Sequence, residues 1–267
     1  TSISLTMPSA IYYNDDYEVT GFLLDENNNG IASKTLIVFL DGTQIQTLTT
    51  ASNGKYTLNL HAEIVGSHTI KIVYDELCRY LESEVTVDYN ILNIPTTLTA
   101  NVSSETKMTN ALTAQNRSVH ALIKSFSIRD HKNNIPPGTL QLVENSSTLE
   151  TINTSATAFN YIPTVEGSHT YTLKYVPAYG YEAKTITLTT TAVKTNVIIT
   201  YSTTQKLFAL GETVKITGTI HTEHGFTLAY GTLKIGLSSL TDISHANGKF
   251  NKSFTGLALG QYTCTAQ

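Results

Sequence analysis

The stretch GSHTIKIVY, residues 66–74, decides the fold class, because its apolar side chains alternate with polar ones. Ile70 and Ile72 then fall on one face of an extended chain, with the period of a half-buried β-strand. The stretch recurs as GSHTYTLKY from Gly167, 101 residues later, and less closely as GQYTCTA from Gly260. Three ordered copies of one strand predict a chain of three similar units.

Other motifs keep the same order around this strand. SNGKYTL from Ser52 reappears as ANGKFNK from Ala246, with a degenerate middle copy, SATAFNY, from Ser155. Each unit also opens on a similar stretch: TSISL, TTLTA or TNVII. The short linkers are not rich in Gly and Ser, so we expect semi-rigid connections. The predicted domains are residues 1–92, 93–193 and 194–267.

Further alternating runs predict strands, separated by turn dipeptides such as Asn29-Gly30, in which both residues are expected at positive φ. Short strands with a turn about every 8 to 12 residues are typical of an antiparallel β-sandwich. The predicted strands are residues 17–24, 34–40, 56–60, 119–128, 139–143, 185–189, 213–220 and 232–237.

The composition excludes several classes of protein. The chain has 44 Thr, 15 Tyr and no Trp in 267 residues, a strand-forming composition that rules out an all-helical fold. Its net charge of −4, with scattered acids, offers no basic surface for a nucleic acid. The longest apolar run, residues 36–40, is far shorter than the roughly 18 residues that span a bilayer. We therefore expect neither nucleic-acid binding nor membrane contact from this segment.

The order of motifs resembles the prokaryotic immunoglobulin-like repeat domains of adhesin-like bacterial and archaeal cell-surface proteins. The resemblance covers the whole chain and is carried by DENNNGI from Asp25, DG at Asp41, NGKY from Asn53 and GSHTIKIVY from Gly66. It implies tandem immunoglobulin-like antiparallel β-sandwiches in a rod-like array, secretion, and display at the cell surface. It supplies no ligand, because function resides in sites rather than in folds.

Some related groups carry an isopeptide bond between a first-strand Lys and a last-strand Asn, beside an acid. The opening stretch of residues 1–6 has no Lys, so we do not expect the bond in the first unit. In the second unit Lys107 follows shortly after the opening strand, so an isopeptide bond stays an open alternative there.

The best metal-binding pattern is Asp25, Asn27 and Asn29 before Gly30, which matches the first half of a calcium loop. Leu36 stands where such a loop needs a bidentate Glu. A hairpin turn is the favoured interpretation, and no metal or other cofactor is expected.

A zinc site from His221, Glu223 and His224, with His245 nearby, is the second metal hypothesis. Residues 221 and 224 would face opposite sides of a strand, so solvated turn residues are the favoured interpretation. The sequence also shows no nucleophile elbow, phosphate loop or dinucleotide fingerprint, and no carboxylates paired for acid–base chemistry. We do not expect an enzyme.

The histidines and cysteines point to structural roles. His68 and His169 hold the same place after the marker glycine, which indicates structure. Cys264 aligns with Ile70 and is expected to be a small buried apolar residue. Cys78 is expected to be a loop thiol, with pairing to another chain as the alternative.

Glycosylation is the best supported modification, because a chain with only 14% charged residues needs another source of hydration. The acceptor triplets Asn-x-Ser/Thr begin at Asn101, Asn116, Asn145, Asn153 and Asn251.

The favoured function is a non-enzymatic structural or adhesive segment of a large extracellular cell-surface protein: a stalk, surface filament or lattice component. Expected partners are other copies, further immunoglobulin-like domains, surface glycans, and host or neighbour-cell proteins. The first alternative is a carbohydrate- or protein-binding module that stacks ligands on Tyr12, Tyr13, Tyr179 and Tyr181.

The second alternative is a donor-strand-assembled filament subunit, because the third unit stops before the closing strand expected at residues 82–88 and 185–191. A truncated copy is the favoured interpretation of that ending.

Overall fold

The computed structural model describes residues 1–75, 80–109, 117–203, 207–228, 233–237 and 240–266. This part of the chain is all-β except for α1 (Arg117–His120), and none of its helices is long and apolar enough to cross a membrane. The chain divides into two compact units, and each is described by itself. The first unit comprises Thr1–Asn101, Ser125–Ala158 and Tyr171–Leu188, and the second comprises Val102–Lys124, Phe159–Thr170 and Thr189–Gln267.

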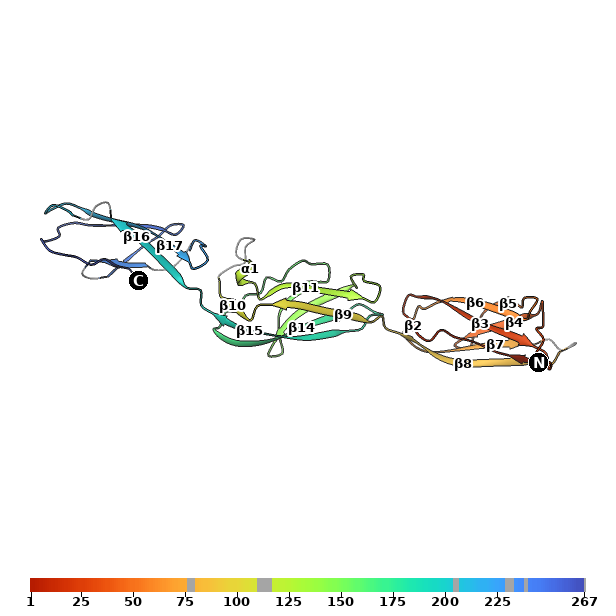
Figure 1. Cartoon of the computed structure of the whole chain (residues 1–267). Coiled ribbons are helices and arrows are strands. Elements are labelled where there is room, and N and C mark those ends of the chain that lie inside the picture. The colour runs from red at the N-terminus through yellow and green to blue at the C-terminus, as the bar shows by residue number, and fades with distance from the viewer. Residues whose placement is uncertain (76–79, 110–116, 204–206, 229–232, 238–239, 267) are drawn as a thin grey trace. The chain divides into compact units, whose positions relative to one another are not determined.

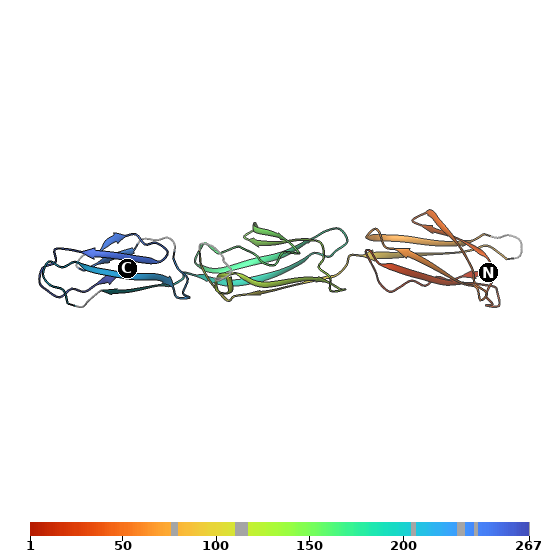
Figure 2. The ribbon, with the colours of Figure 1, turned by 90° about the horizontal axis from the view of Figure 1, so that it is seen from above.

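Residues 1–92, in the first unit, form a sandwich of two sheets with strand orders β1-β3-β6 and β2-β8-β7-β4-β5 (Figures 1 and 2). Val19 and Leu58 of one sheet meet Val38 and Ile72 of the other in a core with 0% exposure at all four. The strands are β1 (Ser2–Ile3), β2 (Ile11–Tyr12), β3 (Asp16–Leu24), β4 (Thr35–Leu40), β5 (Thr43–Thr49), β6 (Lys55–His61), β7 (Gly66–Tyr74) and β8 (Ser83–Leu92).

This strand order is that of an immunoglobulin-like sandwich. Strands A, B and E form one sheet of that fold, and strands G, F, C and C′ form the other. The paired strands are antiparallel except β2, which runs parallel to β8 as an added edge strand. Glycine at position 21 of β3 lets the Tyr56 ring cross the core, because a Cβ there would lie 2.5 Å from that ring. The Tyr56 hydroxyl donates to the Ser4 carbonyl beyond it.

Among the described residues the middle strands repeat this order, except that the smaller sheet has two strands instead of three, and they contribute to both units. Their sheets are β11-β9 and β10-β15-β14-β12-β13, and β10 runs parallel to β15 as β2 does to β8. Within the first unit, Leu140, Leu173 and Tyr175 are buried. The strands are β9 (Thr96–Val102), β10 (Glu105–Lys107), β11 (Ile123–Asp130), β12 (Gly138–Glu144), β13 (Ser147–Asn153), β14 (Gly167–Pro177) and β15 (Lys184–Val193).

The last strands, in the second unit, form sheets β16-β17-β20 and β19-β18-β21. Ile216, Ile235 and Phe250 join the two sheets in one core. The strands are β16 (Val197–Thr203), β17 (Val214–Thr222), β18 (Leu233–Gly236), β19 (Thr241–Ile243), β20 (Lys249–Phe254) and β21 (Thr265–Ala266). The chain is therefore a series of tandem immunoglobulin-like antiparallel β-sandwiches. The predicted boundaries after residues 92 and 193 stay a prediction.

Two strand predictions are corrected. The strand predicted over residues 119–128 begins only at Ile123, because the residues before it form α1 and its following turn. The middle copy of the NGKY motif, residues 155–161, forms no strand. Within this segment the Phe159 carbonyl accepts a hydrogen bond from the Arg117 side chain at 2.7 Å, so that carbonyl has a partner without a β-ladder.

Candidate functional site

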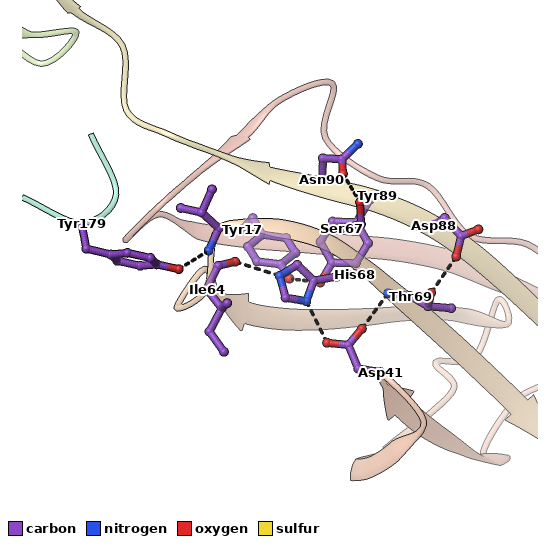
Figure 3. A network of polar contacts seen from close by, with 11 residues as sticks. Tyr17, Asp41, Ile64, Ser67, His68, Thr69, Asp88, Tyr89, Asn90 and Tyr179 are labelled. Carbon is purple, nitrogen blue, oxygen red and sulfur yellow. Dashed lines mark hydrogen bonds and ion pairs between the residues drawn. The ribbon is translucent and has the colours of Figure 1, made fainter. Parts of the chain in front are cut away.

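His68, at the start of β7, lies at the centre of a polar network (Figure 3). Its Nε2 is 2.7 Å from the Ile64 carbonyl oxygen, and its Nδ1 is 2.7 Å from Asp41 Oδ2. Neither the carbonyl nor an ionised carboxylate can donate a proton, so the ring donates to both partners only in its protonated, imidazolium form. Burial lowers the pKa of His68, but the Asp41 carboxylate and the Ile64 carbonyl outweigh it and raise that pKa overall.

Asp41 accepts a second bond from the backbone N–H of Thr69, at 2.8 Å. The bonds from His68 and Thr69 lower the pKa of Asp41. Asp41 has φ 50° and Gly42 has φ 79°, so the turn between β4 and β5 aims the carboxylate at β7. Sequence reasoning identified this turn from Asp-Gly but not its link to His68.

The hydrogen bond from the side chain of residue 68 back to the carbonyl of residue 64 has a counterpart in each of the three sequence repeats. His169 Nε2 lies 2.9 Å from the Val165 carbonyl, and the Tyr262 hydroxyl donates to the Ala258 carbonyl at 3.0 Å. In immunoglobulin domains a tyrosine at this place, two residues before the second Cys, makes the same bond. The repeated histidines are therefore structural, as the sequence indicated, and they stand in for the tyrosine.

A first set of contacts, which we call the first junction, joins residues 12–15 to residues 131–132 and 179–180 inside the first unit. The Tyr12 and His131 rings have centroids 5.1 Å apart. Lys132 Nζ is 2.6 Å from Asp15 Oδ1, and this carboxylate raises the pKa of Lys132. One aromatic contact and one ion pair thus connect the end of β2 to the turn after β11.

Tyr179 supplies the rest of the first junction. Its hydroxyl accepts the Val65 N–H at 2.8 Å (Figure 3). Its ring meets the Tyr13 ring edge-on, with centroids 5.2 Å apart. The Gly180 carbonyl accepts the Ile94 N–H at 2.8 Å. Three of the tyrosines proposed as ligand platforms, Tyr12, Tyr13 and Tyr179, therefore make contacts within the chain, which weakens the binding-module alternative.

A second set, which we call the second junction, lies inside the second unit. Lys107 Nζ is 3.1 Å from Glu105 Oε1 and 3.2 Å from Glu223 Oε1. Asn196 Nδ2 donates to Glu223 Oε2 at 2.8 Å, and the Glu223 N–H donates to the Asn196 carbonyl. Glu105 and Glu223 raise the pKa of Lys107. They hold Lys107 as an ammonium ion, whereas isopeptide formation needs a neutral amine.

The two junctions use equivalent positions. Tyr12 pairs with Leu92 where β2 runs parallel to β8, and Lys107 pairs with Val193 where β10 runs parallel to β15. Val193 lies 101 residues after Leu92, which is the spacing of the repeated marker strand. Their partners lie in equivalent turns: His131 follows the first residue of the turn between β11 and β12, and Glu223 follows the first residue of the turn after β17. One position thus carries an aromatic pair in the first junction and an ion pair in the second.

The predicted calcium-loop residues form a turn. Asp25 Oδ1 accepts the N–H groups of Asn27 and Asn29, both at 2.8 Å, and Oδ2 accepts the Asn29 amide at 3.2 Å. These bonds lower the pKa of Asp25. Asp130 makes the same three bonds in its own turn. The expected positive φ at Asn29 and Gly30 is wrong: Asn28 takes it, with φ 61°.

Gly30 is instead required by a close approach. A Cβ on Gly30 would lie 2.0 Å from the Asn53 carbonyl oxygen, and one on Gly54 would lie 2.7 Å from Gly30 Cα. The two motifs DENNNG and SNGK therefore pack backbone against backbone.

The residues proposed as zinc ligands contact separate partners instead of one common point. His221 Nδ1 lies 2.9 Å from the Thr222 carbonyl, while Glu223 belongs to the second junction. The His224 ring instead meets the buried His120, with centroids 6.1 Å apart. Among the described residues, no three His, Cys, Asp or Glu side chains are grouped to hold a metal ion.

Four of the five predicted glycosylation sites lie in the described residues, and Asn116 lies outside them. Asn101, Asn145, Asn153 and Asn251 are all exposed. Asn145 lies in the β12–β13 turn with φ 48°. Occupancy stays a prediction.

Cys264 is half-buried rather than fully buried, and its side chain packs against the core of Ile216 and Ile235. Burial raises the pKa of its thiol, and a contact with Tyr201 opposes this. Cys78, predicted to be the more accessible cysteine, lies outside the described residues.

Comparison with known proteins adds little to this geometry. No family model matches the sequence, and no curated protein does. Among solved structures, invasin, a bacterial integrin-binding protein, is 14% identical over 99% of this chain and 56% of its own, with a TM-score of 0.40. The Yersinia pseudotuberculosis adhesin InvE is 17% identical over 70% of this chain and 58% of its own, with a TM-score of 0.29.

The fibronectin(III)-like modules of Clostridium thermocellum CbhA are 13% identical over 72% of this chain and 95% of their own, with a TM-score of 0.31. This chain thus spans a little over half of the invasin and InvE structures. All three TM-scores are too low to carry an argument. The assignment as immunoglobulin-like therefore rests on the strand order and the repeated corner bond.

Proposed function

We propose that this chain is a non-enzymatic structural or adhesive segment of a larger secreted cell-surface protein, acting as part of a stalk, surface filament or lattice. The observation that carries the proposal is the pair of junctions at equivalent positions. In the first, Lys132 is 2.6 Å from Asp15; in the second, Lys107 is 3.2 Å from Glu223. A chain of freely moving domains would not need side-chain contacts such as these ion pairs at both of its junctions.

The surface chemistry supports the same role. With 14% charged residues the chain relies on uncharged polar groups for hydration, and four described acceptor asparagines are exposed. Glycans on them would suit an extracellular, cell-surface location. The partners that fit are further immunoglobulin-like domains of the same protein, other copies, surface glycans, and proteins of a host or neighbouring cell.

Small-angle scattering of the whole chain tests the proposal. A single compact globule of 267 residues would have a radius of gyration of about 18 Å. We expect a clearly larger value and an extended distance distribution, because a series of sandwiches joined by short linkers that are not rich in Gly and Ser is expected to be extended. A value near that of a compact globule would contradict the proposal.

A second candidate, recognition of a carbohydrate or peptide, is favoured by one groove in the second unit. It has a volume of about 560 Å³. Its lining is largely Thr, Ser, Asn and Lys, with one exposed tyrosine, Tyr201. Asn251, an acceptor asparagine, also lines it, so a glycan there would cover the groove. A glycan array probed with the chain and with Tyr201→Ala tests this candidate: binding lost in the variant would support it.

A further inference from the structure

The strand β5 is an unusually bare sheet edge. It is the last strand of its sheet, so one side of its backbone faces away from β4. Six of its seven residues are exposed, and its sequence, TQIQTLT, contains no charge, Pro or Gly. Edge strands are commonly protected by charges, Pro, bulges or short length, because an unprotected edge recruits another strand. Of these devices β5 has only the bulge at Ile45, where its register with β4 shifts.

The equivalent strands are better protected. β13 pairs with β12 as β5 pairs with β4, with the same register shift. Gln46 lies opposite Val38, and Glu150 occupies the matching place opposite Leu142. A carboxylate thus replaces the central amide. The third such strand, β19, has only three residues and contains Asp242.

Acceptor triplets add to this contrast. Those of Asn145 and Asn153 begin just before β13 and at its last residue. Residues 1–92 contain no acceptor triplet. Among the three strands at this place in a sandwich, β5, β13 and β19, the bare edge is therefore specific to β5.

We propose that β5 is a homotypic interaction strand, which pairs antiparallel with β5 of a second copy about a two-fold axis at Gln46. This register places Thr43 opposite Thr49 and Gln46 opposite its own copy. Thr–Thr and amide–amide pairs hydrogen-bond across strands, and no like charges are opposed. Because β5 carries no charge, it can face its own copy without like-charge repulsion, which favours a second copy as the occupant, and a two-fold contact closes at the dimer.

The contact is weak in solution. One strand pair buries much less than the roughly 1,600 Å² of a standard interface, so we expect a dissociation constant between about 100 μM and about 1 mM. Copies anchored on one surface would gain from repeated contacts. The inference goes beyond the proposed function, because a chain that never dimerises overturns it and leaves the scattering test of the structural role unaffected.

Sedimentation equilibrium of the whole chain, from about 10 μM to about 1 mM, tests the pairing. The unmodified chain should show a monomer–dimer equilibrium. Gln46→Glu, which copies β13, and Gln46→Lys should each weaken it by at least about tenfold, because two like charges meet at the axis. An equimolar mixture of the two variants should restore the dimer, and the neutral control Gln46→Asn should retain it.

Three outcomes would overturn the proposal: a chain that stays monomeric to about 1 mM, a dimer unaffected by both charged variants, or a mixture that does not recover. Circular dichroism checks that each variant is folded. Thr47→Glu gives a second charge at the same edge if either Gln46 variant fails to fold, and it should also weaken the dimer.

Discussion

His68 and Asp41 form a charged pair that ties two separate turns to one strand. The imidazolium Nδ1 lies 2.7 Å from the carboxylate, while Nε2 binds the Ile64 carbonyl at the other side of the ring. The adjacent Val65 N–H donates to Tyr179 in the first junction. The corner that His68 holds is therefore continuous with that junction, so the protonation state of His68 bears on both.

The pair makes the stability of the first sandwich depend on pH. The raised pKa of His68 means that its contribution is complete below its unfolded pKa, near 6.5, and is lost as pH rises through the folded value. The lowered pKa of Asp41 means that its contribution is present above about 3.9 and is lost as pH falls through the folded value. The pair therefore stabilises most between about pH 4 and pH 6.

Asp41→Asn should accordingly lower the free energy of unfolding by about 0.5–1 kcal/mol near pH 5.5, since Asp41 is half exposed and solvent screens the pair. The loss should be smaller near pH 8.5. Thermal unfolding at the two pH values measures this, and an NMR titration should show a lower His68 pKa in the variant. An equal loss at both pH values would show that the pair is not charged.

His68→Tyr should keep the corner and remove its pH dependence. Tyr262 makes the equivalent bond in the third repeat with a neutral hydroxyl. A tyrosine at position 68 is therefore expected to donate to the Ile64 carbonyl at any pH below its own titration. His68→Ala, which has no donor, is the matched control and should lose stability throughout. Thermal unfolding between about pH 5 and pH 8 distinguishes the two, and a steep pH dependence in His68→Tyr would contradict this account.

The fold was predictable because its signals are local. Period-two alternation at Ile70 and Ile72 and the Asn-Gly and Asp-Gly turns specify strands and reversals over a few residues. β5 and β13 were not predicted, because both faces of a projecting edge strand are exposed and its sequence need not alternate. α1 and residues 155–161, which form no strand, are linked by the bond from Arg117 to the Phe159 carbonyl, a contact 42 residues apart in sequence that no local pattern predicts.

The candidate site was less predictable, for the same reason. Repetition of His68 and His169 indicated a structural role, but their carbonyl acceptors became visible only with the folded corner. The junction pairs use different chemistry at equivalent positions, so comparing Tyr12 with Lys107 in the sequence alone shows nothing in common. Only the strand register makes them equivalent.

Cys264 should react slowly with thiol reagents in the folded chain. It is half-buried, and burial raises the pKa of its thiol, which leaves less of the reactive thiolate at neutral pH. In a Cys78→Ser variant, which isolates the Cys264 signal, labelling near pH 7.5 should be at least about tenfold slower in native than in denatured protein. Equal rates would place Cys264 at an open surface and contradict its packing against Ile216 and Ile235.

Gly180→Ala should loosen the first junction. Gly180 has φ 89°, which costs an L-residue about 1 kcal/mol, and a Cβ there would lie 2.0 Å from the Tyr13 ring. Gly211→Ala separates these two effects. Gly211 has a similar φ of 86°, but a Cβ at that position would meet nothing within 4 Å.

The Tyr13 ring, displaced in Gly180→Ala, should lose its edge-on contact with Tyr179, 5.2 Å away in the native chain. Proteolysis in the linker at residues 93–95 should then be faster in Gly180→Ala than in Gly211→Ala, because the Ile94 N–H bond to the Gly180 carbonyl is disturbed as well. Equal cleavage rates in the two variants would mean that crowding of the Tyr13 ring does not loosen the linker, and would contradict a role for Tyr13 in holding the junction.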